Sequence, residues 1–71
     1  MAKPLTAVVH KEEDAYVAVC AEVGTSSQGK TIDQAIANLK EATELYLQEF
    51  PLKSKARAWV ITFEVPASAR A

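Results

Sequence analysis

The chain has 71 residues, a formal net charge of −1 and an apolar content of 49%, which together predict one small domain. This balanced charge argues against a nucleic-acid-binding surface over the whole domain, and no apolar run approaches the roughly 20 residues of a membrane span. Cys20 is the only cysteine and His10 the only histidine, which excludes a disulfide within the chain and a zinc site of several cysteines and histidines.

Two β-strands are predicted in the first third of the chain. Residues 5–10 are rich in β-formers and follow Pro4, which is typical of a strand entrance. The polar residues 11–14 predict a hairpin loop of about four residues. Residues 15–21 carry apolar side chains on both faces, because side chains alternate along a strand. This pattern is typical of a central strand that is covered on both sides.

A short edge strand over residues 25–28 and a long helix are predicted next. Thr31 is a suitable N-cap and Gln34 completes a capping box. We expect Gly29 to adopt the left-handed conformation that leads into the helix. Pro51 disfavours helical geometry at Phe50 and ends the helix there. Mainly apolar side chains recur at steps of three and four residues and form one stripe: Ile32, Ala35, Ile36, Leu39, Ala42, Thr43, Tyr46, Leu47 and Phe50.

A last strand is predicted over residues 56–65, where Trp59 and Phe63 share an apolar face and Pro66 stops the strand. The domain then spans residues 1–66, and residues 67–71 form a disordered tail. A right-handed crossover through the helix would place this strand beside the first one. The predicted fold is therefore α+β, in the order β-β-β-α-β. Its four-stranded, mainly antiparallel sheet has the strand order 3-2-1-4 and one helix on one face.

One helix covers only one face of this sheet, so we expect the other face to bind another chain. A chain this short also buries only about 60% of its unfolded surface, which favours a homo-oligomer, either a dimer or a tetramer. Leu45 interrupts the polar face of the helix. A single exposed leucine is ordinary, and the alternative is that Leu45 marks a contact with another chain. The candidate interface residues are Val8, Val17 and Val19 on the sheet and Glu41, Glu44 and Leu45 on the helix.

Few residues suggest catalysis, and we expect no catalytic residue, no metal and no cofactor. Glu12, Glu13 and Asp14 are adjacent carboxylates, but consecutive side chains diverge and suit a solvated hairpin tip better than a metal site. His10 has no recognisable partner for acid–base work. Cys20 lies among valines and alanines, a setting typical of an inert, packed thiol.

Two further patterns concern phosphate groups. The string from Gly24 to Thr31 matches the phosphate-loop pattern G-x-x-x-x-G-K-[ST] letter for letter. Such loops work in larger parallel sheets with further acidic elements, so a glycine turn before a capped helix is the preferred interpretation. Lys53, Lys55 and Arg57 form a basic cluster that could contact phosphates. A solvated connection is the simpler interpretation of that cluster.

Three stretches resemble the HicB family of antitoxins: residues 14–20 (DAYVAVC), residues 27–31 (SQGKT) and residues 35–47, with the run A-x-x-N-L-K-E-A. The family has a "DGYYVA" hairpin, an "SQGDT" turn and an "EALENLKEAIELYL" helix. This chain differs at Ala15, where the family has glycine, and it lacks the usual "PDLPG" between Cys20 and Gly24. Only six residues follow Val65, so we expect no DNA-binding domain.

The resemblance implies a partial ribonuclease-H-like fold. It also implies a role in neutralising a small basic HicA-type toxin that cleaves messenger RNA. The expected function is thus protein binding without catalysis. The N-terminus shows no apolar signal core and the single thiol suits a reducing compartment, so a cytoplasmic location is expected. Three alternatives stay open: an oligomeric HicB-like domain with another binding role, a metal-dependent ribonuclease using Glu12 or Asp14, and a nucleic-acid-binding module.

Overall fold

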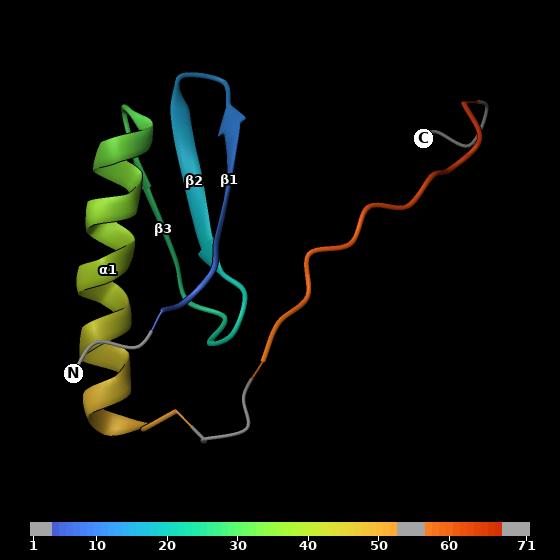
Figure 1. Ribbon diagram of the computed structural model, residues 1–71. Coiled ribbons are helices and arrows are strands. Elements are labelled where there is room, and N and C mark those ends of the chain that lie inside the picture. The colour runs from blue at the N-terminus through green and yellow to red at the C-terminus, as the bar shows by residue number, and fades with distance from the viewer. Residues whose placement is uncertain (1–3, 53–56, 68–71) are drawn as a thin grey trace.

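The computed structural model describes residues 4–52 and 57–67. Within these residues the chain forms three strands followed by one helix (Figure 1). The strands are β1 (Ala7–Glu12), β2 (Ala15–Cys20) and β3 (Ser26–Gly29), and the helix is α1 (Ile32–Glu49).

The three strands form an antiparallel sheet in the order β1-β2-β3. Glu12 pairs with Ala15 across the hairpin, so the loop consists of two residues. The predicted four-residue loop is therefore wrong. Strand pairing uses backbone groups, and the polar side chains of Lys11 and Glu12 do not prevent it. Glu13 has a φ of 51°, the left-handed conformation that such short hairpin turns require.

The capped start of α1 agrees with the sequence. The Gln34 N–H donates to the Thr31 hydroxyl oxygen at 3.0 Å, and the Lys30 N–H donates to the Gln34 side-chain oxygen at 2.7 Å. Gly29, however, ends β3 and is not left-handed, contrary to prediction. A side chain there would lie 2.6 Å from the Ala35 backbone nitrogen, so close approach of β3 to α1 explains the glycine.

The core lies between α1 and the two strands β2 and β3. Its buried side chains are Ala18 and Cys20 on β2 and Ala35 and Leu39 on α1. The buried Thr43 hydroxyl lies 2.6 Å from that of Thr25, which fixes the second half of the helix. The helix makes few contacts with β1, so the sheet is covered on one face and only over two of its strands.

The predicted fourth strand is wrong, and with it the 3-2-1-4 sheet and the partial ribonuclease-H-like architecture. Residues 57–66 form no strand and run away from the sheet as an extended chain (Figure 1). The side chains of Trp59 and Phe63 are 70% and 84% exposed. The alternation of residues 57–66 is compatible with a strand, but it does not fix which sheet edge the strand would pair with. The predicted start at Ala56 and the basic residues Lys53 and Lys55 lie outside the described residues.

Candidate protein-binding surfaces

The face of the sheet that points away from α1 carries the first candidate surface. Ala18 and Cys20 of β2 point into the core, so Val17 and Val19 point outward. Val8 pairs with Val19, and His10 pairs with Val17, which adds β1 side chains to the same face. Val8 is 49% exposed. The structure thus brings three predicted interface residues, Val8, Val17 and Val19, onto one surface, which we call the outer sheet face.

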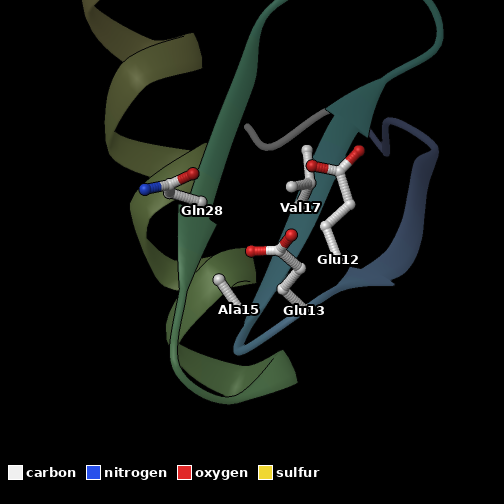
Figure 2. A pocket seen from close by; sticks show the side chains of 5 residues that line it. All are labelled: Glu12, Glu13, Ala15, Val17 and Gln28. Atoms are coloured by element: carbon white, nitrogen blue, oxygen red, sulfur yellow. The ribbon is translucent and has the colours of Figure 1, made fainter.

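An open hollow of about 510 Å³ lies at the hairpin end of the outer sheet face. Figure 2 shows the carboxylates of Glu12 and Glu13 beside Val17, with Gln28 of β3 at the border. His10 Nε2 lies 3.0 Å from Glu12 Oε2, which holds one of these carboxylates against β1. Carboxylates over an apolar floor suit a lysine or arginine, whose charged head pairs with oxygen while its methylene groups cover the valine. We call this feature the acidic hollow.

The second candidate surface is a groove of about 460 Å³ between β1 and α1, which we call the β1–α1 groove. Leu5 and Ala7 form one wall, Ile36 and Leu47 form the other, and Cys20 lies at the base. The groove exists because α1 lies over β2 and β3, leaving the β1 side of its apolar stripe without cover. It is an apolar cleft beside a free strand edge, and it can take apolar side chains from another segment.

The remaining predicted interface residues lie on α1, away from the outer sheet face. Glu41 and Leu45 are exposed one turn apart on the helix, and Leu45 is 58% exposed. Glu44 instead borders the β1–α1 groove. The six predicted residues therefore belong to three separate surfaces.

Sequence reasoning missed the most exposed apolar stretch of the described chain, residues 57–66, which we call the apolar segment. Trp59, Ile61, Phe63 and Val65 are all at least 64% exposed. The Arg57 guanidinium lies 5.3 Å from the centre of the Trp59 ring, as expected when alternate residues of an extended chain share a face. Their alternation was visible in the sequence, but it indicated a strand of the same sheet.

Glu22 was also missed, and it fastens the chain before β1 to the loop after β2. The Thr6 N–H donates to Glu22 Oε1 at 2.7 Å, and the Thr6 hydroxyl donates to Oε2 at 2.8 Å. The backbone hydrogen bond, followed by the hydroxyl bond, lowers the pKa of Glu22 from its usual value near 4.5. These two residues are 16 positions apart, and no local pattern marks the pair.

The phosphate-loop interpretation is not supported by the geometry. Residues 26–29 form β3 and pair with β2, and the Lys30 N–H already has a partner in Gln34. In the described residues, no group of three or more His, Cys, Asp or Glu side chains is placed to hold a metal ion. The described part of the chain also has no helix with the length and apolar character needed to cross a membrane.

Comparison with known proteins adds one relative. The chain is 36% identical over 67 residues to a UPF0150 protein of Helicobacter pylori, and the match covers 86% of this chain and 93% of that protein. No protein-family model matches the chain. No solved structure matches it either. At this identity and coverage, the chain belongs to the UPF0150 family.

Proposed function

We propose that this chain is a protein-binding antitoxin of the HicB type, which neutralises a small basic HicA-type toxin that cleaves messenger RNA. The acidic hollow carries the proposal, because it combines carboxylates and an apolar floor on an otherwise uncovered sheet face. The HicB-like stretches at residues 14–20, 27–31 and 35–47 support it. Neutralisation occurs in the cytoplasm and needs no catalytic residue of this chain.

Binding would place basic side chains of the toxin in the acidic hollow. Glu12 and Glu13 pair with the charged heads, and Val17 supports the methylene groups. Val8 and Val19 extend the apolar contact along the outer sheet face. A toxin that is held in this way by its basic, RNA-binding surface can no longer bind messenger RNA. The attraction between opposite charges also speeds association, most strongly at low salt.

The test begins with the tagged protein expressed in its own host. We expect a stoichiometric small basic protein to co-purify, to cleave RNA when separated, and to lose that activity in the complex. The double variant Glu12→Gln, Glu13→Gln should bind this partner at least about tenfold more weakly, mainly through slower association. The control variant Asp33→Asn, Glu49→Gln removes the same charge from exposed helix positions outside the candidate surfaces.

Equal weakening in both double variants would show that only net charge matters and would remove the acidic hollow from the proposal. A co-purifying protein without ribonuclease activity would favour the second candidate function, an oligomeric HicB-like domain with another binding role. The exposed apolar segment favours that candidate, because it provides a contact surface independent of the acidic hollow.

A further inference from the structure

We propose that two copies of this chain exchange their apolar segments, so that residues 57–66 of each copy lie in the β1–α1 groove of the other. This inference goes beyond the proposed function and does not depend on a toxin. It explains why a folded chain exposes its largest apolar side chains, and it assigns an occupant to a cleft that the chain leaves open.

The accessible surface of the whole chain is larger than that of a compact monomer of the same mass. The accessible surface is 6245 Å² for a mass of 7.7 kDa. A compact monomer of this mass exposes about 4,300 Å². The excess is therefore roughly 1,900 Å² per chain, or roughly 3,800 Å² for a pair, within the range of obligate homodimers. The apolar segment holds the most exposed apolar side chains of the described residues, so it is the part of this surface that a partner would stabilise most by covering it.

The β1–α1 groove offers the apolar segment both packing and hydrogen bonds. Its walls include Ile36 and Leu47, and Ile36 is 37% exposed. The backbone oxygen of Thr6 accepts from Ala21, so by alternation Thr6, Val8 and His10 bond toward β2. The N–H and C=O groups of Ala7, Val9 and Lys11 then point to the free edge of the sheet.

The apolar segment has the properties that this edge and groove require. Trp59, Ile61, Phe63 and Val65 alternate with other residues, so they can all face α1 while the backbone follows β1. No proline interrupts the segment before Pro66, so every backbone N–H up to Val65 can donate. β1 has six residues, and with Leu5 and Thr6 before it this edge offers eight, enough to pair with residues 58–65 of the segment.

The position of the segment favours a second copy over the chain's own groove. The segment has apolar side chains on both faces, with Ala58 and Val60 opposite Trp59. Its own protomer covers neither face, and the segment leads away from its own sheet (Figure 1). In a two-fold exchange each copy gives its segment and receives one, so the contact is self-complementary and closes as a dimer.

Trp59 is the only tryptophan and reports directly on the exchange. On dilution of the full-length protein, we expect its fluorescence to move to longer wavelength as the dimer dissociates, in step with the mass measured by light scattering. Phe63→Ser should weaken self-association roughly tenfold to a hundredfold. Phe63 is 84% exposed, so this change should leave the circular dichroism of the protomer unaltered. Leu45→Ser, at an exposed helix position outside the groove, is the matched control.

Mixed disulfides test where the segment binds. In a Cys20→Ala background, one preparation carries Ile61→Cys and the other carries Ile36→Cys. Oxidation of the mixture should link one chain of each kind, whereas Ile61→Cys mixed with Leu45→Cys should not link. Monomers at all concentrations, with a concentration-independent Trp59 spectrum, would overturn the proposal. A dimer that is weakened by Leu45→Ser but not by Phe63→Ser would overturn it as well. Neither result affects toxin binding, which is read separately from ribonuclease inhibition.

Discussion

Glu22 is the single residue whose ionisation contributes most clearly to this fold. Its carboxylate accepts two hydrogen bonds from Thr6, and these bonds lower its pKa. A pKa below that of the unfolded chain means that the stabilisation is complete above the unfolded value near 4.5 and is lost as pH falls through the folded value. We therefore expect Glu22→Gln to reduce the loss of unfolding free energy between about pH 6 and pH 3.

Urea unfolding at a series of pH values measures this effect. Glu49→Gln, at the exposed end of α1, removes an equal charge and should leave the pH dependence close to that of the original protein. If the two variants flatten the pH profile equally, the Thr6 contact has no special role. The contact could not be predicted from the sequence, because it joins residues 16 positions apart and depends on how the hairpin ends meet.

Among the elements, the junction of β3 and α1 shows how local sequence signals become structure. In the run S-Q-G-K-T, Gly29 allows β3 to lie close to the backbone of α1, and Thr31 caps the N-terminus of the helix. The backbone oxygen of Gln28 accepts from the Asn38 side chain at 2.8 Å, which ties the helix to β3. Gly29, Thr31 and Asn38, which lie in the stretches that resemble HicB antitoxins, therefore help to hold the helix on the sheet. These signals act over a few residues, and the helix start was accordingly predicted correctly.

Gly29→Ala should push β3 and α1 apart at the point where they lie closest. The new methyl carbon would lie 2.6 Å from the Ala35 nitrogen and 2.8 Å from the Gln34 carbonyl carbon, and backbone atoms cannot rotate away as side chains do. We expect the unfolding free energy to fall by about 1–3 kcal/mol, as for overpacked cores. Gln28→Ala, next to it on β3 and exposed, should change it by less than about 0.5 kcal/mol. Urea unfolding gives both values, and equal losses would contradict the steric explanation.

The apolar segment shows what an element's own pattern cannot decide. The side-chain pattern over residues 56–65 places apolar residues on both faces of an extended segment, which favours burial of both faces. The pattern does not show whether the same chain or another chain buries them. The sequence reading assigned the cover to the same sheet, whereas the structure leaves residues 57–66 extended and exposed. The apolar stripe of the helix is also wider than the surface that β2 and β3 cover, so Ile36, Tyr46 and Phe50 stay exposed. This width was a second sign in the sequence that another segment packs against the helix.

At the scale of the whole molecule, the single chain has little core with which to be stable. Ala18, Cys20, Ala35 and Leu39 are its buried apolar residues within the described parts, and three of them are small. The radius of gyration is 14.3 Å, compared with about 11 Å for a compact chain of this length. Burial of this size leaves little margin over the conformational entropy that folding removes.

The exchange of apolar segments would therefore make stability depend on concentration. Dissociation and unfolding are then coupled, and each tenfold rise in concentration adds about 1.4 kcal/mol per dimer. This free energy amounts to about 0.7 kcal/mol per chain, so each tenfold rise in concentration should raise the melting temperature by about 3–6 °C. Calorimetry over a range of protein concentrations measures the shift, and Phe63→Ser should lower both the melting temperature and its dependence on concentration. A melting temperature that does not change with protein concentration would mean that the monomer is stable with four buried apolar side chains. The exposed apolar segment would then not be buried by a second copy.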